Sequence, residues 1–107
     1  MPELSKIRRE YHTSKLDIDM LDHNPFRQFE QWLNEAIRAE VPDATAMGLS
    51  TATSAGRISS RIVLLKEIDH EGFVFFTNYE SKKGMQIDEN PLAALLFFWP
   101  DIERQVR

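Results

Sequence analysis

The segment from Arg57 to Lys83 restricts the possible folds of this chain more than any other stretch. It contains two runs rich in apolar and β-branched residues, 57–68 and 73–78, separated by the sequence Asp-His-Glu-Gly at 69–72. Two strand-like runs around a short polar turn are typical of a β-hairpin. The segment ends in Ser81-Lys82-Lys83, which suits the start of a short helix over 81–89. The sequence therefore predicts a sheet organised around this hairpin.

An amphipathic helix is predicted before the hairpin. Asn24 can cap it by accepting a hydrogen bond from an amide of the first turn, and Pro25 suits the first helical position, where its missing N–H would have no partner. The helix is expected to end near Glu40, before Val41-Pro42. Its apolar side chains recur at spacings of three and four residues and are assigned to the core: Phe26, Phe29, Trp32, Leu33, Ala36 and Ile37.

Further strands are predicted on both sides of the hairpin. Small and hydroxyl-bearing residues favour a strand over 44–53, and 92–99 is apolar at consecutive positions, so we expect it to be buried on both faces. A last strand begins at 103. A meander of four strands in chain order would leave its final strand without a partner, and such an edge invites association with more chain. We therefore expect either a fragment of a longer protein or a second subunit that completes the sheet.

Composition excludes several classes of protein. The chain has 107 residues, enough for one domain, with 42% hydrophobic and 28% charged residues, as in globular proteins. No apolar run approaches the roughly 18 residues of a membrane helix, and the N-terminus lacks the apolar region of a signal peptide. The absence of cysteine is compatible with the cytoplasm, where we expect the protein. A net charge of −4 argues against a general nucleic-acid binder.

Basic residues mark the ends of the predicted strands and the helix start. Arg61 and Lys66 are five positions apart, so in a regular strand they point to opposite faces, and one ligand meets both only through a bulge or around the strand end. Lys82 and Lys83 are unfavourable at a helix N-terminus unless an anion such as phosphate binds there. The Thr77 hydroxyl could serve the same phosphate. Ordinary charged strand ends, surface lysines and a β-forming threonine remain open as alternatives.

Other chemistry has little support in the sequence. His12, His23 and His70 are scattered and form no metal-binding spacing with carboxylates. No Ser-His-Asp set, phosphate-binding loop or dinucleotide-binding glycine motif is present. Redox or phosphate-ligand chemistry remains by elimination.

Several sequence blocks occur in an order that resembles one known family. They are RIVLLK at 61–66, FFTN at 75–78, SKKxxQI at 81–87, NPxxALLFFW at 90–99 and ERQV at 103–106. Together they resemble the N-terminal half of the pyridoxamine (pyridoxine) 5′-phosphate oxidases, which are FMN enzymes. RREY at 8–11 and NPFxxFxxW at 24–32 strengthen a resemblance that covers nearly all 107 residues.

The resemblance implies a mainly β fold with peripheral helices, a partial FMN-binding split β-barrel of Greek-key type. It implies a flexible N-terminal segment or lid over 1–24, a split-barrel domain over 25–107, and a homodimer with FMN at the subunit interface. The implied reaction belongs to vitamin B6 metabolism. It oxidises pyridoxamine or pyridoxine 5′-phosphate to pyridoxal 5′-phosphate, with hydride passing to FMN and O₂ as the final acceptor.

The cofactor contacts implied by the motifs lie mainly on the hairpin segment. Arg61, Lys82 and Lys83 would bind the FMN phosphate, and Gln105 would contact the isoalloxazine ring. Phe76 stands where relatives often have Tyr. Lys82 stands where many have Arg, which replaces a bidentate fork with a point charge. The full implied set is Arg61, Ile62, Val63, Leu64, Leu65, Lys66, Phe76, Thr77, Lys82, Lys83 and Gln105.

The implied substrate contacts are Arg8 and Tyr11, in the mobile N-terminal segment, and Lys66, on the substrate phosphate. No catalytic side chain and no metal ligand is assigned. The family continues for about as many residues again and ends in an Arg-x-His-Asp-Arg-type motif, so we expect this chain to be truncated. Two other functions are kept: a non-catalytic flavin- or haem-binding split barrel, and a half-barrel interaction module without a cofactor.

Overall fold

The computed structural model describes residues 2–8, 10, 16–76 and 90–107. One α-helix, α1 (Pro25–Arg38), accompanies six strands in the described residues. The strands are β1 (Ala46–Ala52), β2 (Ile58–Leu64), β3 (Glu67–Asp69), β4 (Gly72–Val74), β5 (Ala93–Trp99) and β6 (Arg104–Val106). Short 3₁₀ helices are η1 (Leu4–Lys6), η2 (Ile18–Met20) and η3 (Pro100–Ile102).

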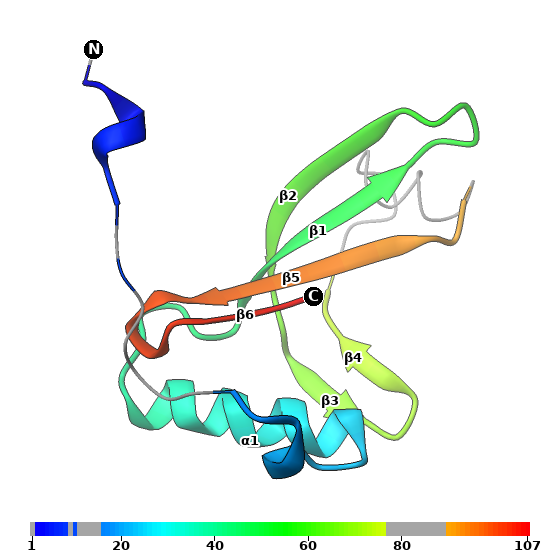
Figure 1. Cartoon of the computed structure of the whole chain (residues 1–107). Helices are drawn as coiled ribbons and strands as arrows, with labels where there is room; N and C mark the ends of the chain where they lie inside the picture. Colours follow the sequence, from blue (N-terminus) through cyan, green and yellow to red (C-terminus); the bar gives the residue numbers. More distant parts are fainter. Residues whose placement is uncertain (1, 9, 11–15, 77–89) are drawn as a thin grey trace.

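The strands form two antiparallel sheets. The larger has the order β2-β1-β5-β6, and the smaller is the β3-β4 hairpin. In Figure 1 α1 runs below the larger sheet and the hairpin lies beside the helix, while residues 2–8 stand apart from both. The described part of the chain contains no closed barrel. The prediction of a mainly β, partial barrel with a peripheral helix is confirmed.

Helix α1 begins and ends close to the predicted positions. Asn24 Oδ1 accepts a hydrogen bond from the Phe26 amide at 3.0 Å, and Pro25 occupies the first turn. The side chain of Gln28 is buried, and its Oε1 accepts a hydrogen bond from the Asp22 amide at 2.7 Å, which fastens the preceding segment to the helix. Phe29 and Ala36 are buried, whereas Phe26 and Ile37, at the margins of the predicted stripe, are 45% and 50% exposed.

The core lies between α1, the hairpin and β5. The ring of Phe29 is 4.8 Å from the rings of both Phe73 and Phe97, and 5.8 Å from that of Trp99. The Trp99 indole N–H donates to the Ala44 carbonyl at 2.8 Å, so this buried polar group is satisfied. One aromatic side chain of the helix thus joins the helix to both sheets.

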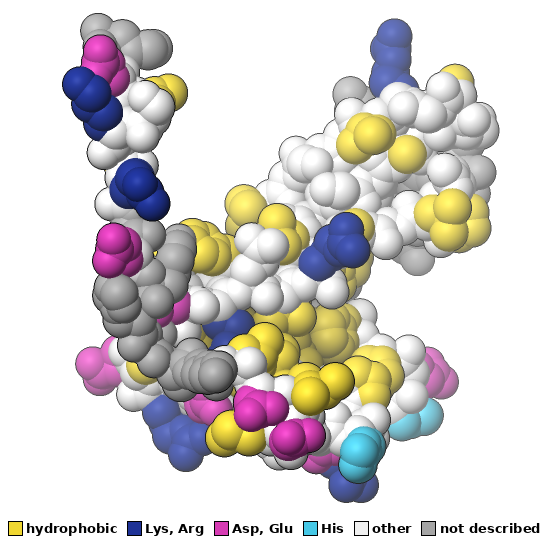
Figure 2. All heavy atoms as spheres, in the orientation of Figure 1, with side chains coloured by type: hydrophobic (Ala, Val, Ile, Leu, Met, Phe, Trp, Pro, Cys, Tyr) yellow, Lys and Arg dark blue, Asp and Glu magenta, His cyan; other side chains and the backbone are white. Residues whose placement is uncertain are grey.

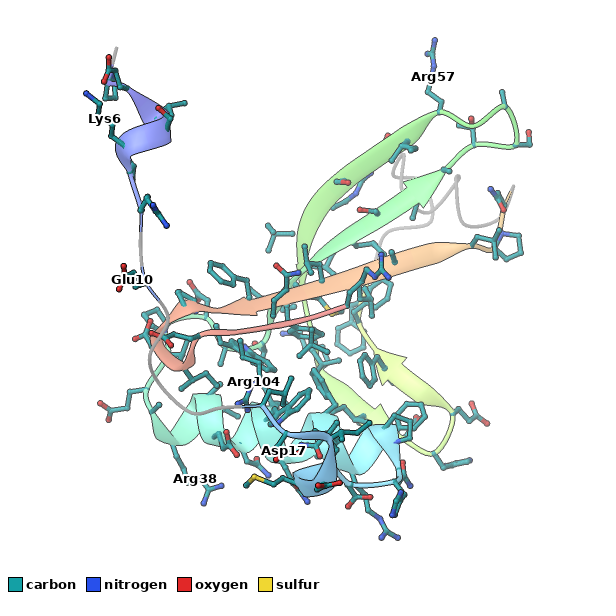
Figure 3. The ribbon with its side chains drawn as sticks, in the orientation of Figure 1. Lys6, Glu10, Asp17, Arg38, Arg57 and Arg104 are labelled. Carbon is teal, nitrogen blue, oxygen red and sulfur yellow. The ribbon has the colours of Figure 1, made fainter. Side chains whose placement is uncertain are left out.

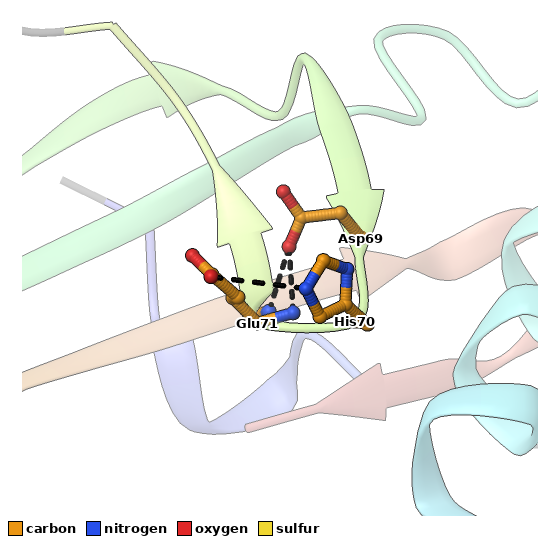
Figure 4. A network of polar contacts seen from close by, with 4 residues as sticks. Asp69, His70 and Glu71 are labelled. Carbon is orange, nitrogen blue, oxygen red and sulfur yellow. Dashed lines mark hydrogen bonds and ion pairs between the residues drawn. The ribbon is translucent and has the colours of Figure 1, made fainter.

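The predicted hairpin turn is present between β3 and β4. Asp69 Oδ1 accepts hydrogen bonds from the amides of Glu71 and Gly72 at 2.8 and 3.1 Å, as Figure 4 shows. Gly72 has a φ of 140°, which glycine adopts without steric cost. His70 and Glu71 are exposed, with 3.7 Å between His70 Nε2 and Glu71 Oε1. His70 therefore belongs to a surface turn.

The predicted continuous strand over 57–68 is wrong. It divides into β2 and β3 because the backbone changes partner between Leu65 and Lys66. The Leu65 amide donates to Thr45 O beside β1, whereas the Lys66 amide donates to Val74 O of β4, at 2.9 and 2.8 Å. The second hairpin strand is also shorter than predicted: β4 ends at Val74.

The order of the larger sheet differs from a meander. Strand β5 returns to pair with β1, so the central strands are β1 and β5 and the edges are β2 and β6. The expectation that 92–99 is buried on both faces is wrong as well. Phe97 and Trp99 are buried against α1, but Leu96 and Phe98 are 43% and 55% exposed on the other face. The predicted strand from 103 is confirmed as β6. The helix predicted over 81–89 lies outside the described residues.

Candidate cofactor site

The backbone register places Arg61 on the α1 side of the sheet. Arg61 pairs with Leu49, which is fully buried and in turn pairs with Leu95. The Arg61 Nε is buried and has no hydrogen-bond partner among the described residues. A buried N–H without a partner is costly, and an anion would satisfy it with a charge-assisted hydrogen bond. The position therefore fits a contact with an anion, and the phosphate role that the resemblance implies for Arg61 stays a prediction.

The other members of the predicted strand divide between two faces. Val63 and Leu65 are 8% and 6% exposed in the core, so a ligand would reach their backbone rather than their side chains. Ile62 and Leu64 point to the opposite face, where they are 70% and 45% exposed. A single ligand on one face of the sheet therefore meets only part of the segment 61–66.

Lys66 occupies the point where the chain leaves the larger sheet. Its side chain is exposed and lines a cavity of about 300 Å³ together with Glu30, Asn34, Thr45 and Glu67. Because β2 ends at Leu64, the alternation of side chains does not extend to Lys66. Lys66 thus lies just past the end of β2, and its contact with a ligand stays a prediction.

Gln105 lies on the outer face of the larger sheet, the face turned away from α1. It pairs with Phe98 and is exposed, while its neighbour Arg104 pairs with Trp99 on the helix side. Phe76 is 74% exposed just after the hairpin. Arg61 and Gln105 are therefore on opposite faces of the same sheet.

The remaining predicted residues are at the N-terminus or undescribed. Arg8 is exposed in the segment that stands apart in Figure 1. Tyr11, Thr77, Lys82 and Lys83 lie outside the described residues, so the predicted convergence of Arg61 with the two lysines stays a prediction.

The sequence did not predict an apolar groove between α1, the hairpin and β5. Its volume is about 500 Å³, and Phe26, Phe29, Phe73 and Phe97 contribute to its lining. Figure 2 shows hydrophobic side chains lining the hollow between the sheet and the helix. The signal was present in the apolar stripe of α1, which sequence reasoning assigned wholly to the core.

A second missed feature joins α1 to β6. Arg104 Nη1 donates to Glu35 Oε2 at 3.1 Å, and its guanidinium carbon is 4.7 Å from the centre of the Trp32 ring. Figure 3 shows Arg104 between the sheet and the helix, whereas Arg38 and Arg57 point away from the body of the molecule. No sequence spacing links residues so far apart.

Metal-binding clusters and membrane-spanning helices are both absent from the described residues. They contain no group of three His, Cys, Asp or Glu side chains able to hold a metal ion. None of the helices in this part of the chain has the length and apolarity to cross a membrane.

Comparison with known proteins identifies the family. The family model described as pyridoxamine 5′-phosphate oxidase matches residues 33–107. The chain belongs to this family. One relative in this family, the pyridoxine/pyridoxamine 5′-phosphate oxidase of Paraburkholderia phytofirmans, is 50% identical to the chain over its whole length. That of Neisseria meningitidis is 51% identical over 98% of the chain. The chain spans about half the length of these curated relatives, 50% in each case.

Two solved structures resemble this family member in fold. PhzG from Burkholderia lata, in complex with tetrahydrophenazine-1-carboxylic acid, has a TM-score of 0.76 and 36% identity, covering 81% of this chain and 44% of PhzG. A pyridoxamine 5′-phosphate oxidase-related, FMN-binding protein from Nostoc punctiforme has a TM-score of 0.65 and 22% identity, covering 79% of this chain and 44% of its own. The latter supports the fold alone. The resemblance expected from the sequence is confirmed.

Proposed function

We propose that this chain forms part of an FMN-dependent oxidase that converts pyridoxamine or pyridoxine 5′-phosphate to pyridoxal 5′-phosphate. The observation that carries the proposal is the family match over residues 33–107. The Arg61 Nε, buried without a hydrogen-bond partner among the described residues, supports an anion site on the strand that this function requires.

The residues of the chain would bind and orient the two phosphorylated molecules. Bound FMN would supply the redox chemistry, by accepting a hydride from the 4′-carbon of the substrate and transferring electrons to O₂. Arg61, with Lys82 and Lys83, would neutralise the FMN phosphate. The exposed ammonium of Lys66 would bind the substrate phosphate, and the N-terminal Arg8 and Tyr11 would close over the substrate.

A homodimer would reconcile the positions of the proposed ligands. Arg61 and Gln105 lie on opposite faces of one sheet, so one ligand cannot lie flat against both within a single copy. The outer face carries several exposed apolar side chains, as an interface would. We propose that a second copy covers this face and that each cofactor site takes residues from both copies. The protein is expected to act in the cytoplasm.

The PhzG likeness supports a second candidate, oxidation of a fused-ring carboxylic acid. PhzG is 36% identical and its structure contains tetrahydrophenazine-1-carboxylic acid. The two candidates differ in the anion on the substrate, a phosphate in one and a carboxylate in the other. Two alternatives remain: a non-catalytic flavin- or haem-binding protein, and a half-barrel interaction module without a cofactor, which would show neither flavin nor haem absorbance.

The experiment is to purify the full-length protein, record its visible spectrum and measure peroxide release with each substrate. We expect flavin absorbance, and peroxide with pyridoxine 5′-phosphate but not with pyridoxine. Peroxide only with the fused-ring acid would support the PhzG-like function. Flavin without peroxide would support a non-catalytic protein, and a haem spectrum would contradict the FMN proposal.

A further inference from the structure

Strand β6 makes side-chain contacts with helix α1 and the core. It is three residues long and, in the described sheet, pairs with β5 alone. It follows the 3₁₀ helix η3 and Glu103, whose backbone is left-handed with a φ of 53°. The side chains of β6 alternate between the two faces of the sheet, so their contacts help to set which way each residue of the strand faces.

Arg104 supplies a directional contact from this strand. Its side chain is only 12% exposed, lies against the Trp32 ring, and donates to Glu35 Oε2 at 3.1 Å. We call Trp32, Glu35 and Arg104 the Arg104 clamp. The neighbouring Val106 also packs on the core, but an aliphatic side chain has no preferred direction of contact. The planar guanidinium, stacked on a ring and bonded to a carboxylate, does have one.

The orientation of Arg104 determines that of Gln105, because side chains alternate between the two faces of a strand. Arg104 pairs with Trp99 on the helix side, and Gln105 pairs with Phe98 on the outer face. Successive side chains of a strand point in opposite directions, so fixing Arg104 also fixes the direction in which Gln105 leaves the sheet.

We infer that Arg104 is a positioning residue that holds Gln105 in the orientation needed to contact the ring of bound FMN. This inference rests on the proposed function, in which Gln105 makes that contact. The small free energy expected from the ion pair between Arg104 and Glu35 favours a role in orienting the strand over a role in stability. Glu35 is 49% exposed, and ion pairs with an exposed partner add little to stability.

A double-mutant cycle in the full-length protein tests the inference, with the FMN dissociation constant measured by quenching of flavin fluorescence. Arg104→Lys keeps the charge but loses the planar contact with Trp32 and Glu35. In the presence of Gln105 we expect this change to weaken FMN binding about fivefold. In a Gln105→Ala background it should change the constant by less than about twofold, because the residue through which Arg104 acts is gone.

A purely structural role for Arg104 predicts equal weakening in both backgrounds, and that result would overturn the inference. So would unchanged FMN binding in Arg104→Lys or in Gln105→Ala alone. Arg38→Lys is the matched control. Arg38 is on the same helix as the clamp partners, but its exposed side chain bonds only to the Asn34 carbonyl in the described structure, so FMN binding should not change.

Glu35→Gln provides a milder variant should Arg104→Lys fold poorly. It keeps the shape of the acceptor and removes its charge, and we expect a smaller, still Gln105-dependent weakening. Equal weakening with and without Gln105 would again overturn the inference. Failure of the proposed function is recognised by a different result. If the wild-type protein binds no FMN, both the proposed function and the positioning role of Arg104 are overturned. If the wild-type protein and the Gln105→Ala variant bind FMN equally well, only the positioning role of Arg104 is overturned.

Discussion

Arg61 shows how one side chain can couple the sheet to a ligand. The register with Leu49 holds it on the helix side, and its Nε is buried without a hydrogen-bond partner among the described residues. Such a group gains more from an anion than an exposed arginine does, because water competes less for it.

Arg61→Ala is therefore expected to weaken FMN binding about tenfold or more, the effect of losing a hydrogen bond to a charged group. Arg61→Lys should recover only part of the affinity, because the ammonium lacks the guanidinium fork. The measurement is a flavin titration of the apoprotein. Arg57→Ala, at the exposed tip of the β1–β2 hairpin in Figure 3, is the control and should bind FMN normally. Equal affinities for Arg61→Ala and Arg57→Ala would contradict the phosphate role.

Lys66 lies past the end of β2, and its proposed partner is the substrate phosphate. We expect Lys66→Ala to raise KM for pyridoxine 5′-phosphate about tenfold or more, while FMN retention falls much less. Steady-state peroxide assays and flavin content measure the two effects. Arg38→Ala, at an exposed position of α1, is the control and should leave KM unchanged. Equal loss of substrate use and flavin retention would count against the substrate role.

Glu40 stores backbone strain at the end of α1. Its φ is 57°, and the bonds from the Glu40 amide to Ile37 O and from the Val41 amide to Ala36 O form a Schellman motif, which favours glycine at this position. We expect Glu40→Gly to raise the free energy of unfolding by about 1 kcal/mol in urea denaturation. Glu30→Gly, within the same helix, should lower it by about 1 kcal/mol. A destabilised Glu40→Gly would refute the strain argument.

At the scale of elements, α1 joins the two sheets through Phe29, which contacts Phe73 of the hairpin and Phe97 of β5. Removing this ring would leave a cavity at the junction. We expect Phe29→Ala to lower the free energy of unfolding by about 3–5 kcal/mol, measured by chemical denaturation. Phe26→Ala removes a ring that is 45% exposed and should cost clearly less. Similar losses for both would mean that Phe29 is not the junction.

The elements also show which features a sequence can reveal. Helix α1 was predictable because its cap at Asn24 and its periodicity are local signals. The division of β2 from β3 was not, because it arises when Lys66 changes its hydrogen-bond partner to β4, a tertiary event. The one-sided exposure of β5 was hidden as well, since Leu96 and Phe98 are as apolar as their buried neighbours. The contact of Arg104 with Glu35 spans 69 positions and left no pattern.

At the scale of the whole molecule, the outer face of the larger sheet exposes apolar side chains in the described structure. Because side chains alternate along a strand, five apolar side chains of β2 and β5 lie on this outer face. They are between 43% and 73% exposed: Ile58, Ile62, Leu64, Leu96 and Phe98. Apolar patches of this kind mark interaction surfaces. This face is the surface on which we propose that the second copy packs.

We expect Phe98→Lys to convert the proposed homodimer of the full-length protein to monomer, because burying an unpaired charge costs several kcal/mol. Sedimentation velocity measures the change. Ile18→Lys is the control, since Ile18 is 81% exposed in η2 and lies outside the sheet. A dimer that withstands lysine at both Phe98 and Ile62 would place the interface elsewhere.

Trp99, whose indole N–H donates a hydrogen bond to the Ala44 carbonyl, gives this protein a fluorescent probe in its interior. The chain has two tryptophans, and their environments differ: Trp99 is 1% exposed and fixed in the interior, while Trp32 is partly exposed and stacked under a cation. Their emission wavelengths should differ accordingly, with Trp99 at the blue end. Emission at the blue end of the band therefore reports on the interior, and emission at the red end reports on the attachment of β6 to α1.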